Sequence, residues 1–244
     1  MLFRSQLRPG ADLAPDDELL QVAARQAACA GLGAAGAYVE AGNDVFGQPA
    51  ARLRPRQRRA LGLHFVPEER LGRGAVPTLG LAHNLLLTRS NAVGKGGWIS
   101  HRALDKHAGE IIRRFNVKAG GPSAAARSLS GGNLQKFIVG REIDANPKLF
   151  IVSQPTWGVD VGAAALIRGE ILALRDAGCA VLVVSEELDE LFEISDRLYV
   201  IAKGRLSPSV DRAAATVPQI GEWMSGLWNA PGAAQAAQQE VARA

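Results

Sequence analysis

The feature that most constrains this chain is a pair of glycines directly before a run with helical spacing. The stretch reads Leu129-Ser130-Gly131-Gly132-Asn133, and the helical run continues to about residue 143. Glycine has no Cβ, so the backbone here can come close to a ligand. The start of a helix offers unpaired N–H groups and a partial positive charge to an anion. The pattern predicts a phosphate-contacting turn, although Ser130 would also serve as a helix N-cap whether or not anything binds.

Three further stretches follow the glycine pair in a fixed order. An apolar run over residues 149–152 ends in Ser153 and Gln154, Asp160 stands before another helical run, and an apolar run over 178–184 leads to Glu186. In this order the four stretches resemble the signature motif, the Walker B strand, the D-loop and the switch strand of ABC-transporter ATPases. The resemblance extends from about residue 38 to 226. It is strongest to the second, degenerate nucleotide-binding half of importers for simple sugars and nucleosides.

The resemblance implies an α/β fold and a domain spanning residues 37–226. That fold is a P-loop NTPase-like ABC ATPase core with a mostly parallel sheet, a helical subdomain at about 78–145 and a small antiparallel β part. The alternation of helical and apolar strand-like runs also indicates a parallel sheet. Within the subdomain, apolar residues at helical spacing predict a helix over 103–115; they are Leu104, Ala108, Ile111, Ile112 and Phe115.

The two ends of the chain do not fit this domain. Residues 2–5 read Leu-Phe-Arg-Ser, a tetrapeptide that the end of a common sequencing adapter yields on translation. We therefore interpret residues 1–36 as an uncertain or truncated start and hypothesise that the protein begins upstream. Residues 227–244 are rich in Ala and Gln, which predicts a flexible tail.

The residues with which the family hydrolyses ATP are replaced or missing. The Gly-x-x-x-x-Gly-Lys-Ser/Thr phosphate loop does not occur in the sequence, and we interpret the Gly94-Lys95 pair as an exposed turn. The resemblance places Ser153 and Gln154 where an aspartate holds magnesium and a glutamate polarises water, and Glu186 where the switch histidine would stand. Neither Ser153 nor Gln154 can carry the negative charge that this chemistry needs. We therefore expect no metal ligand and no catalytic residue, and no ATP hydrolysis by this chain alone, in spite of its ATPase family.

Two other segments resemble parts of the family that contact partners. Pro67-Glu68-Glu69-Arg70 is similar to the Q-loop, which senses the γ-phosphate and couples to the permease, with Glu68 near the place of the usual glutamine. A helix started by the proline, with a surface Glu–Arg pair, is the alternative. As the D-loop residue, Asp160 would contact the partner domain, and it is also well placed as a helix N-cap.

Charge and cysteine content exclude several other classes of protein. The net charge is +4, and the basic run over residues 52–59 is interpreted as a solvated helix face, so we expect no nucleic-acid partner. Two separated cysteines, Cys29 and Cys179, and four histidines exclude a disulfide framework and a Cys-rich zinc site. The apolar runs are too short to span a membrane. A role at a membrane therefore requires other subunits.

The resemblance implies one leading function and two alternatives. The signature residues Leu129 to Asn133 would close in trans over ATP and Mg²⁺ that are held mainly by the first nucleotide-binding half. The implied partners are that half, membrane permease subunits and, indirectly, a solute-binding protein, at the cytoplasmic face of the inner membrane. The solute would be a nucleoside or a simple sugar. The alternatives are a soluble ABC-type regulatory or interaction module and a nonfunctional gene fragment.

Overall fold

The computed structural model describes residues 44–45, 48–49, 53–95 and 98–228. These residues belong to two compact units, one reaching Leu182 and the other beginning at Val183. The expected start over residues 1–36 lies outside the described residues, as does the expected tail from residue 229 onward.

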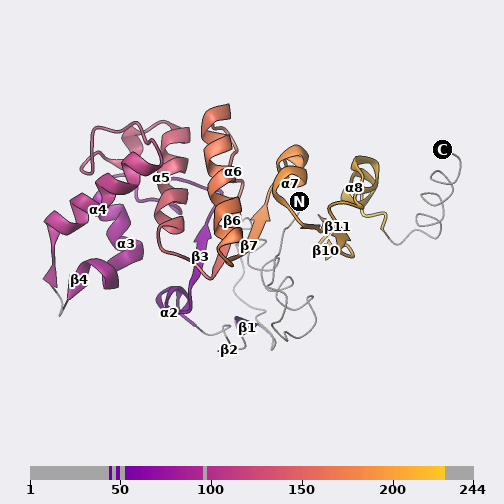
Figure 1. The fold of residues 1–244 in the computed structure, drawn as a ribbon, viewed down its shortest axis with the longest axis horizontal. Helices are drawn as coiled ribbons and strands as arrows, with labels where there is room; N and C mark the ends of the chain where they lie inside the picture. The colour runs from indigo at the N-terminus through magenta and orange to yellow at the C-terminus, as the bar shows by residue number, and fades with distance from the viewer. Residues whose placement is uncertain (1–43, 46–47, 50–52, 96–97, 229–244) are drawn as a thin grey trace, which may run out of the picture. The chain divides into compact units, whose positions relative to one another are not determined.

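Three short, buried strands form one sheet in the order β3-β6-β7. They are β3 (Leu63–Val66), β6 (Leu149–Ser153) and β7 (Ala180–Val184). β3 and β6 run parallel, with Leu63 opposite Leu149 (Figure 1). Most positions of all three strands are buried, as is typical of parallel strands that are covered on both faces. The parallel sheet expected from the sequence is confirmed.

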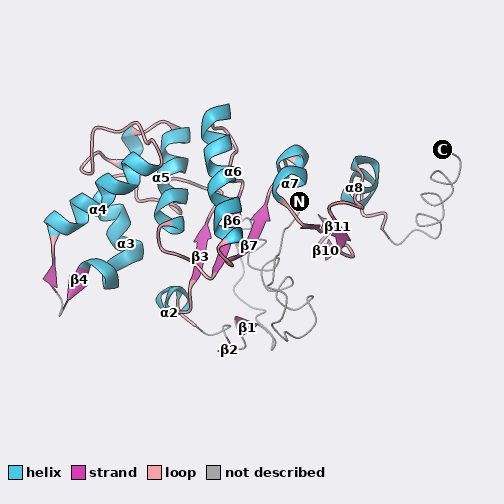
Figure 2. Cartoon of the chain, viewed as in Figure 1, coloured by secondary structure: helices cyan, strands magenta, loops and turns pink. Residues whose placement is uncertain are grey.

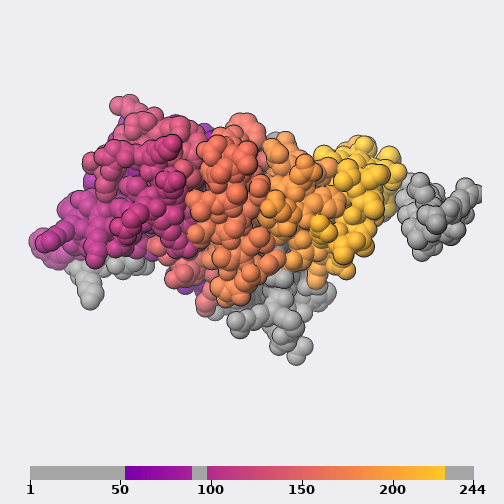
Figure 3. All heavy atoms as spheres, turned by 45° about the horizontal axis from the view of Figure 1, so that its top comes forward, coloured from indigo at the N-terminus to yellow at the C-terminus, as the bar shows by residue number. Residues whose placement is uncertain are grey.

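Helix α5 (Gly131–Ile143) lies at the centre of the larger unit. Every residue from Leu134 to Ile143 is buried, because α5 contacts β3, α4 and α6. A helix with such neighbours needs no polar face. Helix α6 (Val161–Asp176) buries only one stripe, which comprises Ala163, Ala164, Ile167 and Ile171. In the space-filling view the atoms of α6 continue the surface formed by the helices before it (Figure 3).

Two helices that contact each other, α3 (Leu81–Val93) and α4 (His101–Arg114), precede α5 (Figure 2). α4 confirms the predicted helix: Ser100 caps its start by accepting a hydrogen bond from the Ala103 N–H, and Leu104, Ala108 and Ile111 are buried. Phe115 follows, fully buried, as the C-cap. A short 3₁₀ turn, η1 (Ala126–Ser128), leads to the glycine pair. Helix α2 (Pro55–Ala60) lies directly before β3.

The small antiparallel part expected from the sequence is present as isolated two-stranded pairs. In the larger unit these are β1 (Asp44–Val45) with β2 (Gln48–Pro49), and β4 (Gly94–Lys95) with β5 (Trp98–Ile99). The interpretation of Gly94-Lys95 as a turn is therefore wrong. These two residues form a strand, because their backbone pairs with Trp98 and Ile99.

The smaller unit combines short strands with two helices. Its elements are α7 (Leu188–Ile194), β8 (Arg197–Leu198), β9 (Ile201–Ala202), β10 (Arg205–Leu206), β11 (Val210–Asp211) and α8 (Val217–Met224). β8 pairs with β11 and β9 with β10, both antiparallel. Thr216 caps α8 by accepting a hydrogen bond from Gln219 N, and Tyr199, Ile220 and Trp223 are buried.

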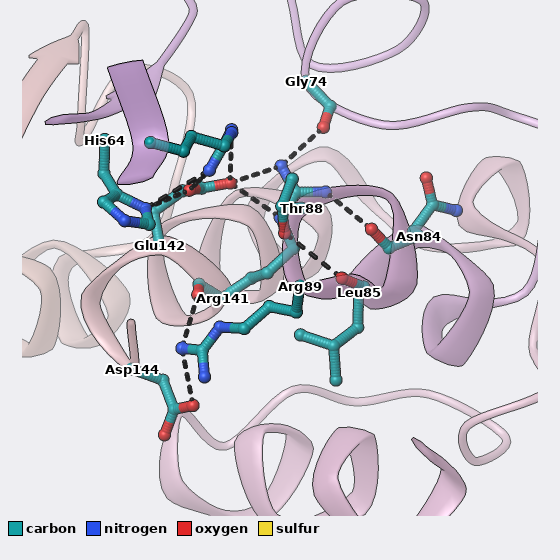
Figure 4. Close-up of polar contacts among 10 residues, drawn as sticks. His64, Gly74, Asn84, Leu85, Thr88, Arg89, Arg141, Glu142 and Asp144 are labelled. Carbon is teal, nitrogen blue, oxygen red and sulfur yellow. Dashed lines mark hydrogen bonds and ion pairs between the residues drawn. The ribbon is translucent and has the colours of Figure 1, made fainter. Parts of the chain in front are cut away.

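A buried carboxylate anchors α5 to its surroundings in the larger unit. Glu142 is fully buried. It accepts hydrogen bonds from Arg59 at 2.6 Å and from Arg141 at 2.9 Å, and its Oε2 lies 2.9 Å from His64 Nδ1 (Figure 4). Arg141 also donates to the carbonyls of Gly74 and Asn84. The solvated helix face expected over residues 52–59 is thus interrupted, because Arg59 reaches inward to this carboxylate.

The electrostatic balance at Glu142 favours the charged form. Burial alone would raise the pKa of Glu142, but Arg141, the hydrogen bond from His64, and Arg59 together lower it to about 2. Burial lowers the pKa of Arg141, and the Glu142 carboxylate acts against this effect. Two residues further on, the C-cap Asp144 accepts from Arg89 at 2.8 Å and from His107 at 2.7 Å. Ion pairs thus connect α5 and its C-cap to α2 and α3, and a hydrogen bond connects the C-cap to α4.

The described residues contain neither a membrane-spanning helix nor a metal-binding cluster. None of their helices has the length and apolar character needed to cross a membrane. In the same part of the chain, no group of three or more His, Cys, Asp or Glu residues is arranged to hold a metal ion.

Burial raises the pKa of Cys179 to about 11, so its thiol is protonated at neutral pH and is a weak nucleophile.

Candidate functional site

The glycine pair forms the first turn of α5, as the sequence predicts. Ser130 is the N-cap, and its Oγ accepts hydrogen bonds from the Asn133 backbone N–H at 3.4 Å and from Asn133 Nδ2 at 2.9 Å. The capping role proposed for Ser130 is therefore confirmed. Because Oγ acts as an acceptor in both contacts, the hydroxyl keeps its own proton for donation to a ligand.

The same turn is open toward solvent. Ser130 and Gly131 are exposed, and Leu129, Gly132 and Asn133 are half-buried. The first N–H groups of α5 have no partner further back in the helix, and they point in the direction in which the helix dipole favours an anion. Asn133 Oδ1 accepts from the Lys118 N–H at 2.8 Å, which fixes the asparagine beside the turn. The geometry can accept a phosphate from outside the chain.

Arg70 connects this turn to two other segments. Its Nε donates to Gln135 Oε1 at 3.0 Å, and its Nη2 donates to the Trp157 carbonyl. The guanidinium carbon lies 5.6 Å from the centroid of the Trp157 ring, within the range of a cation–π contact. Desolvation by burial lowers the pKa of Arg70, but an arginine stays charged in proteins. Arg70 and Gln135 both lie inside motifs visible in the sequence, but the local pattern indicates only a surface Glu–Arg pair for Arg70 and no site role for Gln135.

Gln135 completes the connection from the helix side. Its side chain is buried, with 1% of the residue exposed, and its Nε2 donates to the carbonyls of Pro155 at 3.0 Å and Gln154 at 3.4 Å. Gly132 also lies close to the same loop, since a Cβ placed on it would be 3.7 Å from Val159. The start of α5 and residues 154–159 are therefore neighbours.

The strand end to which the family resemblance assigns an aspartate and a glutamate has neither acid. Ser153 and Gln154 are buried at the end of β6, 8% and 6% exposed, and Gln154 has a φ of 49°, which is uncommon for a residue other than glycine. Gly158 has a φ of 62°, a conformation that glycine adopts without steric cost. The loop thus turns sharply twice between β6 and α6.

Asp160 ends this loop as the N-cap of α6. Its Oδ1 accepts from the Ala163 N–H at 2.9 Å, which confirms the capping role. That backbone hydrogen bond is the main reason why the pKa of Asp160 is lowered. The carboxylate is exposed, and its contact with a partner domain stays a prediction.

The other two predicted site residues are Glu68, in the larger unit, and Glu186, in the smaller one. Glu68 is exposed in a loop after β3, so the alternative of a helix started by Pro67 is wrong. The backbone there forms a turn instead, with Gly74 N–H donating to the Glu69 carbonyl at 3.0 Å and Ala75 N–H to that of Arg70 at 2.7 Å. The surface pair expected within residues 67–70 is also wrong in its arginine, because Glu69 pairs with Arg73 at 2.9 Å, whereas Arg70 donates to Gln135 and the Trp157 carbonyl. Glu186 is exposed and belongs to the smaller unit.

The turn after Glu68 lines a cavity of about 220 Å³. Apolar side chains and arginines share its lining, which comprises Arg59, Phe65, Pro67, Gly72, Arg73, Gly74, Ala75, Val76, Leu87, Thr88 and Arg141. No acidic residue is among them, and Leu87 on α3 is 58% exposed. Its three arginines are already paired with Glu142 or Glu69, so the surface that remains for a partner is mainly apolar.

Comparison with curated proteins identifies relatives of this chain. No protein-family model matches it. It is 41% identical over 175 residues to the nucleoside import ATP-binding protein NupA of Lactococcus lactis subsp. cremoris, covering 71% of this chain and 35% of the relative. It is 37% identical over 182 residues to the guanosine import ATP-binding protein NupO of Bacillus subtilis, with 74% and 36% covered, and 36% identical over 179 residues to the ribose import ATP-binding protein RbsA of Bacillus licheniformis, with 72% and 36% covered. The matched segment thus spans about a third of the length of these relatives.

Solved structures with the same fold are ABC ATPase cassettes. The chain matches the ATP-binding cassette MJ0796 bound to ADP and Pi with a TM-score of 0.58 and 19% identity, over 69% of this chain and 72% of that one. An ATP-binding subunit of an ABC transporter matches with a TM-score of 0.54 and 20% identity, over 76% and 70%. These similarities show the P-loop NTPase fold of ABC ATPases. With its curated relatives among the ATP-binding proteins of nucleoside and sugar importers, the chain belongs to the family of ABC-transporter ATP-binding proteins.

Proposed function

We propose that this chain is the second nucleotide-binding half of the ATP-binding subunit of an ABC importer, and that it donates its signature motif to ATP held by another half. The observation that carries the proposal is a contrast within the site. The start of α5 keeps the serine and the glycine pair, with Ser130 and Gly131 exposed, whereas Ser153 and Gln154 stand in place of two acids where β6 ends. Such a chain supplies the signature turn of a nucleotide site and lacks the acids that hold Mg²⁺ and polarise water.

The chemistry of each side follows from its residues. The Ser130 hydroxyl, the glycine N–H groups and the helix start would stabilise the charge of a γ-phosphate that is presented by a partner. A serine and a glutamine cannot provide the charge that Mg²⁺ and the attacking water need. ATP and Mg²⁺ would therefore be held mainly by the first half, and the chain alone would not hydrolyse ATP.

The relatives and the cavity support a choice of solute and partners. The names of the relatives refer to the import of nucleosides, guanosine and ribose, which supports a nucleoside or a simple sugar as the solute. The permease subunits would dock at the arginine-lined cavity beside the loop of Glu68, with the chain at the cytoplasmic face of the membrane. A solute-binding protein would take part indirectly, through the permease.

Nucleotide retention tests the proposal directly. With a fluorescent ATP analogue and Mg²⁺, the isolated chain should bind weakly or not at all, because the acids of a metal site are missing. A first-half domain should retain the analogue at least about fivefold more tightly when this chain is added, a coupling of ordinary size between two sites. The measurement is a fluorescence titration of each protein alone and of the pair, with the first half alone as the control.

Two results of this titration would contradict the proposal. Tight binding by the isolated chain would indicate a phosphate site of its own. Retention that this chain leaves unchanged would favour a soluble regulatory module or a nonfunctional gene fragment.

Docking at the cavity predicts a separate effect of Leu87. Changing Leu87 to aspartate should reduce the amount of permease that copurifies with the subunit about tenfold or more, because the change places a charge in an apolar contact. Nucleotide retention should stay unchanged. The matched control is Met224→Asp on α8, a residue of the smaller unit that is 45% exposed. Wild-type copurification of the Leu87 variant would remove the cavity as the docking site.

A further inference from the structure

We infer that Arg70 is a positioning residue, which holds the signature turn in register with the loop that ends at Asp160. The inference rests on the proposed function, since it assigns to Arg70 the alignment of two segments that would meet the same nucleotide sandwich. Arg70 does not need to touch the nucleotide for this role. It acts through Gln135 and the Trp157 backbone.

Arg70 uses its guanidinium as a fork that reaches two segments. One arm, Nε, donates to Gln135 on the first turns of α5, and another, Nη2, donates to the Trp157 carbonyl. A Cβ placed on Gly131 would lie 2.7 Å from the third nitrogen, Nη1. The guanidinium thus fills the space between the glycine pair and the loop. A lysine has a single donor group and cannot span both partners in this way.

Gln135 and the backbone of Arg70 are both held in place by further contacts. Gln135 is buried and is itself bonded to the Pro155 carbonyl, so three segments form a closed set of contacts. The backbone of Arg70 is fixed by the Ala75 N–H, which donates to its carbonyl at 2.7 Å. Gly74 permits this turn, since a Cβ there would come within 2.9 Å of the Arg70 carbonyl.

The position of the signature turn should determine how fast the proposed trans site turns over ATP. Ser130 and the glycine N–H groups would stabilise a phosphate only if they were placed correctly, and an error of about 1 Å can cost a factor of about 100 in rate. The first half would hold ATP before the signature closes over it. Loss of Arg70 should therefore affect turnover more than the apparent affinity for ATP.

The test uses the complete subunit assembled with its permease. Arg70→Ala should lower kcat for MgATP hydrolysis about 10- to 100-fold, with KM for ATP changed less than about twofold because the first half supplies the initial binding. Arg70→Lys should not restore kcat, because it keeps the charge and loses the fork. Turnover is expressed per folded complex, determined by size-exclusion chromatography and circular dichroism. Arg113→Ala, an exposed arginine on α4, is the control and should retain wild-type turnover.

A double variant tests whether Arg70 and Gln135 act together, because a general loss of stability would not make their losses in kcat non-additive. If Arg70 acts through Gln135, the Arg70→Ala, Gln135→Ala double variant should be no slower than about the worse single variant, because residues in one network are not additive. Wild-type kcat in Arg70→Ala, full rescue by lysine, or multiplying losses in the double variant would each overturn the inference. The Gly131→Asp variant separates the proposed function from the role of Arg70. If Gly131→Asp hydrolyses ATP normally, the proposed function fails. If Gly131→Asp is impaired while Arg70→Ala is normal, only the role of Arg70 fails.

Discussion

Replacing Gly131 with aspartate in the full-length subunit is expected to abolish stimulated ATP hydrolysis. The new carboxylate would stand at the exposed start of α5, where the proposed function places a γ-phosphate, so two like charges would meet. The Cβ would also lie 2.7 Å from Arg70 Nη1, so the arginine would have to move. Loss of a single donor to a transition-state oxyanion costs about 10²–10³ in rate, and an added repulsion should cost at least that much. Steady-state hydrolysis in the assembled importer is the measurement.

The matched control for this change is Gly169→Asp. Gly169 is exposed on α6, and a Cβ there would have no other atom within 4 Å. The control introduces the same side chain on a helix surface in the same unit and should leave turnover near that of the wild type. Normal hydrolysis by Gly131→Asp, with the control also normal, would remove the central claim of a signature donated in trans.

The parts of the site that could be predicted are those with local determinants. Ser130 and Asp160 act as N-caps through hydrogen bonds to backbone groups three residues later. The helix start, the buried run before Ser153 and the apolar face of α4 likewise depend on neighbours in the sequence. A serine or aspartate before a helical run is therefore informative by itself. The binding role of these residues is a different matter and stays a prediction.

The parts that could not be predicted depend on distant contacts. Arg70 reaches Gln135 and Trp157, which lie 65 and 87 residues further along the chain, so no local pattern indicates that they meet. Gln154 has a φ of 49°, although glutamine has no preference for that region. Arg59 belongs to a run that would suit a solvated helix face. It turns inward because a carboxylate 83 residues away is buried beside it.

That carboxylate leads to the largest expected effect on stability. Glu142 is fully buried, and Arg141, which is 3% exposed, donates to it. Breaking a buried ion pair by removing one partner costs about 3–5 kcal/mol, because the remaining charge is left without compensation. The surface pair of Arg114 with Glu170, 2.8 Å apart and with the Arg114 side chain 49% exposed, should contribute less than about 1 kcal/mol.

Changing Glu142 to glutamine in the full chain should therefore lower the free energy of unfolding by about 3–5 kcal/mol at pH 7, while Glu170→Gln should lower it by less than about 1 kcal/mol.

The contribution of Glu142 to stability should also depend on pH. Its pKa is lowered from 4.5 to about 2 in the folded chain. The stabilisation is therefore complete above the pKa of the unfolded chain and is lost as the pH falls toward the pKa of the folded chain. Glutamine does not titrate, so the difference between wild type and variant should shrink between pH 4.5 and pH 2. Urea unfolding at several pH values, followed by circular dichroism, measures both effects. A difference that is the same at pH 7 and at pH 3, or a loss no larger than that of Glu170→Gln, would show that the charge of Glu142 does not stabilise the fold.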